Sequence, residues 1–202
     1  MNPAHSQFMD NLSRARDLRA LFITLKATTA GVLDLSDILR ASIVSTVNAF
    51  DAFIHDIARI GMVDIYRNTR PRTAAFGRFT VQMDNVLLVV TTPSSTRWLE
   101  DEIRRQHGWL SFQQPDKVAD AIRLFCDKEL WSDVGSRLGI EPKSAKNRLK
   151  LIVDRSNMIA HEADMDPSSP GARWPIDEAL VKEAIDTFEA IANAIFDVVS
   201  TH

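Results

Sequence analysis

A long amphipathic pattern near the C-terminus, at residues 147–164 (NRLKLIVDRSNMIAHEAD), constrains the fold of this chain more than any other feature. Apolar and small residues recur there at intervals of three and four, which places their side chains on one face of an α-helix. This face consists of Leu149, Ile152, Val153, Ser156, Ala160 and Ala163. Because an amphipathic helix buries its apolar face against other elements, we expect the stretch to be one member of a helical bundle.

The same helix is expected to carry a second, smaller apolar strip. At about 100° per residue, Leu151 and Met158 lie nearly opposite the core face, with Arg155 on one side of them and His161 on the other. A helix in a simple bundle needs only one buried face. The second strip therefore predicts another packing surface, and we expect a second copy of the chain to cover it.

The segment RSNMIAH, from Arg155 to His161, resembles the R-x(4–6)-H motif of HEPN domains, and the glutamate that follows matches their usual IAHE ending. Residues 45–59 (STVNAFDAFIHDIAR) are similar to the second helix of the HEPN subgroup named after the RiboL-PSP proteins. That subgroup shares the order Trp131, Leu138-Gly139, Arg155 and His161. The resemblance covers roughly residues 38–202 and implies an all-α, HEPN-like helical bundle with additional helices, assembled as a symmetric homodimer.

HEPN ribonucleases cleave RNA without a metal, so the resemblance implies an endoribonuclease that uses no metal and no other cofactor. In this reaction the 2′-hydroxyl of the RNA attacks the adjacent phosphorus and leaves a 2′,3′-cyclic phosphate. The chemistry needs a group with a pKa near ~6.5 to move protons, which suits His161, and a permanent cation for the phosphate, which suits Arg155. Asn157, one helical turn before the histidine, would orient the imidazole or bind the phosphate.

Two further expectations follow for this motif. Six residues separate Arg155 from His161 by about 9 Å along a helix axis, so the two side chains converge only if two helices cross at the Leu151/Met158 strip. Ser156 stands where many members of the family carry Asn, Asp or His directly after the arginine.

The resemblance also implies a toxin or an anti-phage defence effector, with an antitoxin or a regulatory protein as partner. Some HEPN domains are interaction modules, so a non-catalytic interaction or RNA-binding module stays open as an alternative.

Residues 131–150 (WSDVGSRLGIEPKSAKNRLK) allow a different interpretation, a helix-turn-helix regulator that binds DNA. A short helix, a stop at Leu138-Gly139 and a basic second helix would form it. The recognition face would consist of Lys143, Lys146, Arg148 and Lys150. Because the second helix is expected to continue into the Arg155/His161 segment, we favour a structural corner or a set of cations that guides RNA to that segment.

Other polar residues are weaker candidates. The basic connection at residues 67–72 includes Arg70 and Arg72, which we expect to bind RNA phosphates through paired donors, with a solvated loop as the alternative. Asp51 and His55 form an i, i+4 pair that either supports the motif-bearing helix or is a local surface pair. Residues 164–175 contain Pro and Gly, which predicts an irregular loop beside the motif.

Composition fits one HEPN-like helical domain over residues 1–202, with N-terminal helices in 5–67 and a motif-bearing bundle in 95–200. Helices are expected at 5–30, at 36–66, from Pro115 through Leu130, and after Asp177; residues 79–92 suit a strand or a helix, and the resemblance favours a helix. The net charge of −3 argues against a broad electrostatic nucleic-acid binder. A single cysteine, Cys126, and the lack of metal-ligand spacing argue against a metal site. Without a membrane span or a signal peptide pattern, we expect a cytoplasmic protein.

Overall fold

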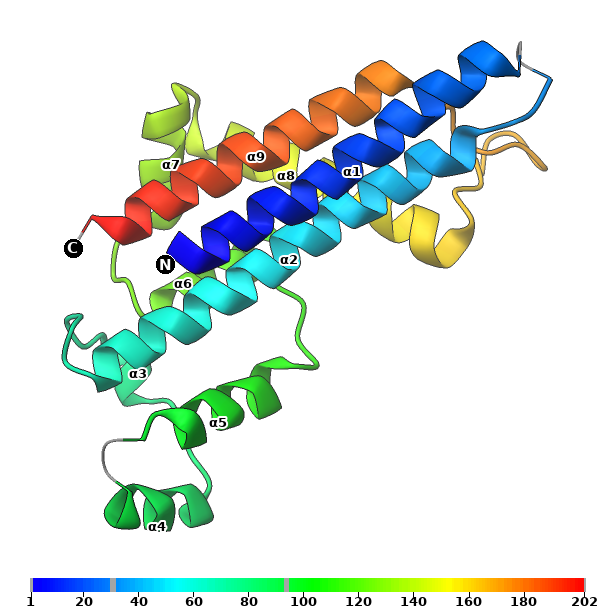
Figure 1. Ribbon diagram of the computed structural model, residues 1–202. Coiled ribbons are helices and arrows are strands. Elements are labelled where there is room, and N and C mark those ends of the chain that lie inside the picture. Colours follow the sequence, from blue (N-terminus) through cyan, green and yellow to red (C-terminus); the bar gives the residue numbers. More distant parts are fainter. Residues whose placement is uncertain (1, 30–31, 93–94, 202) are drawn as a thin grey trace.

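The computed structural model describes residues 2–29, 32–92 and 95–201, and nine helices account for the regular structure of these residues (Figure 1). Three long helices lie side by side: α1 (Asn2–Thr28), α2 (Ser36–Tyr66) and α9 (Glu178–Ser200). A fourth, α8 (Pro142–Glu162), packs against both α2 and α9. The expectation of an all-α protein is confirmed.

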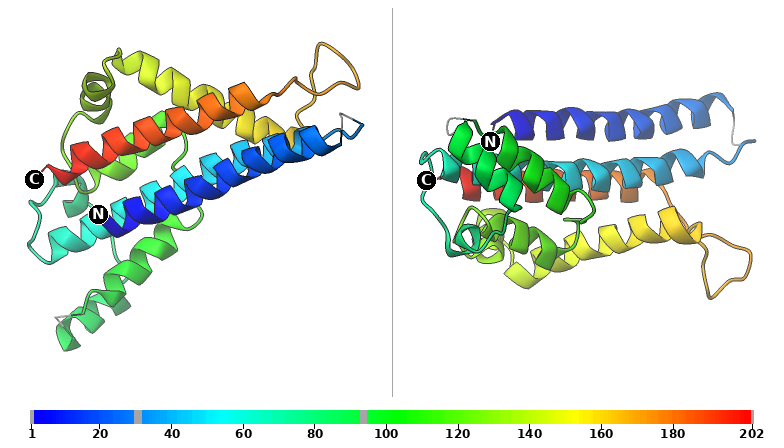
Figure 2. Two further views of the ribbon diagram at one scale, coloured as in Figure 1. Left: turned by 45° about the horizontal axis from the view of Figure 1, so that its top comes forward. Right: turned by 90° about the horizontal axis from the view of Figure 1, so that it is seen from below.

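Five shorter helices complete the chain. Helices α6 (Pro115–Arg123) and α7 (Leu130–Leu138) pack near the start of α8, where α6 also contacts α2 and α7 also contacts α9. Helix α3 (Ala74–Gly77) is a single turn after α2. Helices α4 (Met83–Thr91) and α5 (Arg97–His107) form an arm, in which α5 contacts α2 and α4 lies on the side of α5 away from the main bundle (Figures 1 and 2).

One large core joins α1, α2, α6, α7, α8 and α9. Its largest fully buried side chains include Phe8, Phe50, Phe53, Phe125 and Phe188. A second, smaller core of Met62, Val63, Leu99 and Ile103 holds α5 against the end of α2. The arm is therefore attached to the bundle through only a few apolar side chains.

The predicted helix boundaries agree with the structure at most positions. Helix α2 occupies 36–66 as expected, and the helix favoured for residues 79–92 is present as α4. The single helix expected from Pro115 through Leu130 is wrong, because the chain leaves α6 at Arg123 and enters α7 at Leu130. Tight turns cause the break: the backbone amide of Leu124 bonds to the carbonyl of Ala121, three residues back.

Candidate functional site

The segment from α7 to α8 places the motif-bearing helix. Gly139 ends α7 in the left-handed region, at φ 65°, where a residue without Cβ is least strained. Helix α8 then runs without interruption from Pro142 to Glu162, so the expected continuation of the basic segment into the motif is confirmed. The apolar face is only partly buried as expected: Leu149, Val153 and Ser156 are buried, whereas the alanines at 160 and 163 are exposed.

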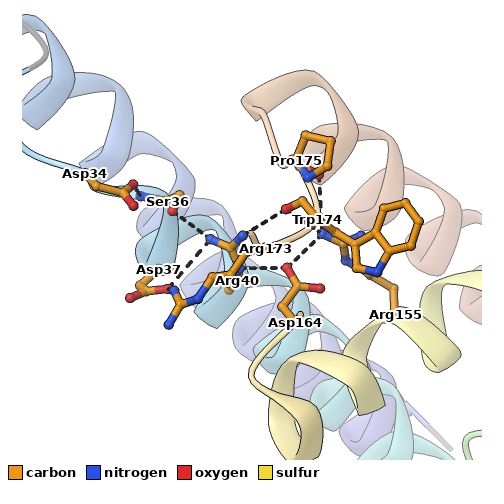
Figure 3. Close-up of polar contacts among 9 residues, drawn as sticks. All are labelled: Asp34, Ser36, Asp37, Arg40, Arg155, Asp164, Arg173, Trp174 and Pro175. Atoms are coloured by element: carbon orange, nitrogen blue, oxygen red, sulfur yellow. Dashed lines mark hydrogen bonds and ion pairs between the residues drawn. The ribbon is translucent and has the colours of Figure 1, made fainter. Parts of the chain in front are cut away.

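Arg155 contacts the loop that follows α8. Its Nη2 donates to Oδ2 of Asp164 at 2.8 Å and to the carbonyl oxygens of Trp174 and Pro175 at 3.2 and 3.3 Å (Figure 3). The Asp164 side chain is fully buried, and the Arg155 side chain is 17% exposed. One of the two predicted catalytic residues therefore also holds the 163–177 loop against the bundle.

A second arginine, from α2, binds the same carboxylate. Arg40 donates from Nε to Oδ2 of Asp164 at 2.7 Å, from Nη2 to the carbonyl of Trp174 at 2.9 Å, and from Nη1 to the hydroxyl of Ser36 at 2.6 Å (Figure 3). Both the Arg40 and Asp164 side chains are largely shielded from solvent, at 7% and 0% exposed. Nη1 of Arg40 also lies 3.7 Å from the carboxylate of Asp37. We call the three residues joined through Asp164 the Arg40–Asp164–Arg155 cluster.

The cluster closes the end of α8. Asp164 has a φ of 59°, and the preceding alanine also lies in the left-handed region, so the chain reverses direction immediately after the helix. The backbone amide of Asp164 bonds to the carbonyl of Met158 at 3.0 Å, and its carbonyl accepts from the amide of Trp174 at 2.9 Å. The loop is irregular as expected, apart from one isolated bridge between Met165 and Arg173. His161 lies three residues before Asp164, in the last turn of α8.

The sequence pattern does not identify Arg40 or Asp164 as site residues. A signal exists for each: an arginine lies between the buried positions Leu39 and Ile43 of an apolar helix, and an aspartate lies two positions after the last residue of α8. Neither signal shows that the two residues are partners, because they lie 124 positions apart in the sequence.

His161 and Asn157 lie exposed on α8, one turn apart. Within the described part of the chain, His161 makes no hydrogen bond or ion pair, and none joins it to Arg155. One copy of the chain therefore does not bring the predicted catalytic arginine and histidine together. Their convergence between two copies stays a prediction.

A hollow of about 330 Å³ lies between α8 and α9, with Ile43 of α2 also lining it. Its other apolar lining includes Leu151 and Leu180, which are 69% and 41% exposed. Arg148 and Arg155 line the same space. We call this space the α8–α9 hollow; its lining combines apolar side chains with two guanidinium groups and the carboxylate of Glu183.

The four basic residues expected to guide nucleic acid have different surroundings. Lys146 is 3.1 Å from the carboxylate of Asp116, and Lys150 forms an ion pair with Asp154. Lys143 and Arg148 are exposed, and neither has a polar partner among the residues that the structure describes. Arg148 is the better placed for a ligand, because it also lines the α8–α9 hollow.

Of the arginines after α2, the two expected to bind RNA, Arg70 and Arg72, have different surroundings. Nη2 of Arg70 donates to the carbonyl of Val199 at 2.7 Å, and the guanidinium lies over the ring of Phe125, 5.3 Å from its centroid. Burial lowers the pKa of Arg70 from its ordinary value. Arg70 therefore holds the end of α9, and this position disfavours the phosphate role that we expected for it. Arg72 remains exposed.

The Asp51–His55 pair supports a different segment from the one expected. Asp51 accepts a hydrogen bond from the backbone amide of Phe112 at 2.6 Å, and Nε2 of His55 lies 3.2 Å from the carbonyl of Leu110. Both contacts hold the connection between α5 and α6. The pair joins α2 to this connection, and none of its hydrogen bonds reaches α8.

Among residues 2–29, 32–92 and 95–201, no cluster of three or more His, Cys, Asp or Glu side chains is arranged to hold a metal ion. Over the same residues, every helix is too short or too polar to span a membrane. Comparison with protein-family models, with curated proteins and with solved structures finds no match to this chain.

Proposed function

We propose that this chain is a metal-independent endoribonuclease of the HEPN type, in which His161 moves the protons of RNA cleavage. The main support is the position of His161 and Asn157, which lie exposed one turn apart at the end of α8, directly before the Arg40–Asp164–Arg155 cluster. The sequence resemblance to HEPN ribonucleases supports the same assignment. Pairing of two copies through α8 would bring two such helix ends into one cleft.

Each group has a chemical role in the proposed reaction. A neutral imidazole of His161 accepts the proton of the 2′-hydroxyl as its oxygen bonds to phosphorus, and the bond from phosphorus to the 5′-oxygen breaks. A protonated imidazole, from His161 of the second copy, donates a proton to that leaving oxygen. An imidazole can both accept and donate a proton under physiological conditions, which suits it to both roles. The products are a 2′,3′-cyclic phosphate and a 5′-hydroxyl.

Arg155 would act on the phosphate while it holds the loop. Its hydrogen bonds to the loop all come from Nη2, so Nη1 has no partner in the described part of the chain. Arg155 lines the α8–α9 hollow, and its Nε is buried without a hydrogen-bond partner in the described structure. Nη1 is therefore the donor that we assign to a phosphate in this hollow. Arg148, on the same hollow, is the second cation that we assign to RNA binding.

One observation favours a second candidate, the non-catalytic helical module. The bonds of Arg155 to a fully buried carboxylate are those of a structural residue, and a structural arginine at this position needs no substrate. The helix-turn-helix alternative has less support, because Lys146 and Lys150 of its recognition face are paired with acidic residues. A toxin or an anti-phage defence effector, controlled by an antitoxin or a regulatory protein, is the setting that we propose for the ribonuclease.

Incubation of the purified protein with nucleic acid in EDTA tests the proposal. Single-stranded RNA should be cut, and DNA of the same sequence should remain whole because it lacks the 2′-hydroxyl nucleophile. The new 3′ ends should resist polyadenylation until the cyclic phosphate is removed. Intact RNA together with tight, sequence-selective binding of duplex DNA would establish the helix-turn-helix alternative. Intact RNA without any nucleic-acid binding would establish the non-catalytic module.

A further inference from the structure

The outer helix of the arm carries an apolar stripe that the rest of the described chain leaves uncovered. Val90, Met83 and Leu87 are 76%, 72% and 62% exposed. They recur at i, i+4 and i+7 and therefore share one face of the helix. Val81, Val86 and Leu88, each at least 36% exposed, flank them. We call these six residues the α4 stripe; none of the residues of α4 itself is buried.

Polar contacts with α5 fix which way the stripe points. Asn85, on the opposite side of α4, donates from Nδ2 to Oε2 of Glu102 at 2.9 Å. The Glu102 side chain is 1% exposed and also accepts from Arg105 and Gln106 of its own helix. Because Asn85 holds the inner side of α4 against this buried carboxylate, the opposite side, with Met83, Leu87 and Val90, faces away from α5. Helix α4 itself lies on the side of α5 away from the main bundle (Figures 1 and 2).

We propose that the α4 stripe is an interface for a second copy of this chain, with two α4–α5 arms packed around a two-fold axis. An apolar stripe matches its own copy under two-fold symmetry, so no different partner is needed. Its side chains expose roughly 600 Å² of apolar surface, at the upper end of what a monomer leaves uncovered. If both stripes were completely covered, two copies would bury at most about 1,200 Å² in total, which is the lower end of the range for specific, stable interfaces.

The charges of α4 disfavour other occupants. A helix that lies in a lipid surface places Lys and Arg on its polar face. Helix α4 has no Lys or Arg between Met83 and Thr91, its only charged residue is Asp84, and its polar side binds the carboxylate of Glu102. The same lack of cations disfavours RNA, whose phosphates need positive charge. A second α4 stripe requires neither.

This interface is separate from the proposed pairing of α8. The α4 stripe lies on the arm, whereas Leu151 and His161 lie on a helix that packs against α2 and α9. A substitution in the α4 stripe therefore tests this interface without altering the residues of the proposed ribonuclease site.

Light scattering coupled to gel filtration, at tens of micromolar protein, tests the interface. Leu87→Glu places a charge in the middle of the stripe and should lower the mass of the wild-type assembly at least twofold. Leu33→Glu is the matched control, because Leu33 is 58% exposed in the connection before α2 and lies outside the stripe. This control should keep the wild-type mass. A far-ultraviolet circular dichroism spectrum like that of the wild type shows that each variant is folded.

Cross-linking gives a second readout that does not depend on weakening the interface. Under mild oxidation Leu87→Cys should form a disulfide-linked dimer, and Leu33→Cys should not; the native Cys126 is buried. A wild-type protein that is monomeric, or a folded Leu87→Glu variant of unchanged mass, would overturn the proposal. Sedimentation of monomeric wild-type protein with phosphatidylglycerol vesicles, lost in Leu87→Glu, would reassign the stripe to a lipid surface.

Discussion

At the scale of single residues, the end of α8 depends on one carboxylate. Asp164 is fully buried and binds the guanidinium groups of Arg40 and Arg155. Removing one member of such a buried set leaves charges without a partner in a poorly solvated place, which costs more than the set itself contributes to stability. The other oxygen of this carboxylate, Oδ1, is buried and has no hydrogen-bond partner in the described structure. Both guanidinium groups therefore donate to the same oxygen, Oδ2.

We expect Asp164→Asn to lower the free energy of unfolding by about 3 kcal/mol, because Arg155 loses its carboxylate partner and the buried Arg40 keeps only the more distant Asp37. Chemical denaturation measures this change. Asp154→Asn is the matched control: Asp154 pairs with Lys150 on the surface, at 39% and 57% exposed, and should cost less than about 1 kcal/mol. Equal effects of the two substitutions would show that the cluster does not stabilise the end of α8.

The sequence predicted part of this site and missed the rest for a physical reason. Helical periodicity correctly places Arg155 and His161 on one helix and predicts that their side chains do not meet within one chain. Both predictions depend only on residues close together in the sequence. The partners of Arg155 come from α2 and from the loop after α8, and no local pattern pairs residues so far apart. The same limit applies to Arg70, whose bond to the carbonyl of Val199 depends on how α9 ends.

At the scale of elements, the arm is the part of the fold that pH should affect most. His107, the last residue of α5, is buried, and its Nδ1 has no partner within the described residues. Its ring meets those of Phe79 and Phe112 edge-on, with centroids 6.1 and 5.3 Å away. Burial, and secondarily the charge of the nearby His55, lower the pKa of His107. His107 also lines a small pocket of about 140 Å³, together with Asp56, Arg59 and Arg104.

The direction of the pH effect follows from this lowered pKa. The unfolded chain takes up the proton near pH ~6.5, whereas the folded protein resists protonation until a lower pH. Stability is therefore complete above about pH 6.5 and is lost as the pH falls below that value. We expect faster hydrogen exchange of the α5 amides at pH 5.5 than the intrinsic pH dependence of exchange alone predicts.

His107→Phe should remove much of this pH sensitivity, because phenylalanine fills the aromatic site without a titrating group. Thermal unfolding at pH 7.0 and 5.5 measures it: the fall in midpoint should be smaller in His107→Phe than in the wild type. His161→Phe is the control, since His161 is exposed, and should keep the wild-type fall. An undiminished fall in His107→Phe would place the acid-sensitive group elsewhere.

The helices themselves were largely predictable, and their interruptions were not. Repeated apolar spacing predicts long helices such as α2 and α9, and the apolar residues of that spacing are buried in the structure. The stretch from Val118 to Leu130 keeps a similar spacing, yet the chain turns after α6 so that Phe125 and Cys126 both enter the core. Burial in the tertiary structure outweighed the local preference there.

At the scale of the whole molecule, the fold separates two surfaces. The main bundle presents α8 with His161, Asn157 and the α8–α9 hollow, and the arm presents the α4 stripe. If both surfaces pair with second copies, the assembly is larger than a dimer, and Leu87→Glu should reduce it to the unit held by α8. Catalysis in the proposed mechanism requires only the α8 pair, so cleavage activity should survive loss of the α4 interface.

The most direct test of proton transfer by His161 measures the rate at which the wild type and His161→Ala cleave single-stranded RNA in EDTA. Loss of proton transfer should slow cleavage roughly 10²–10⁴-fold. Because His161 is exposed and makes no polar contact in the described structure, the circular dichroism spectrum and the affinity for uncleavable 2′-O-methyl RNA should change little. Cleavage by His161→Ala at the wild-type rate would contradict the account, since the reactive group would then lie elsewhere.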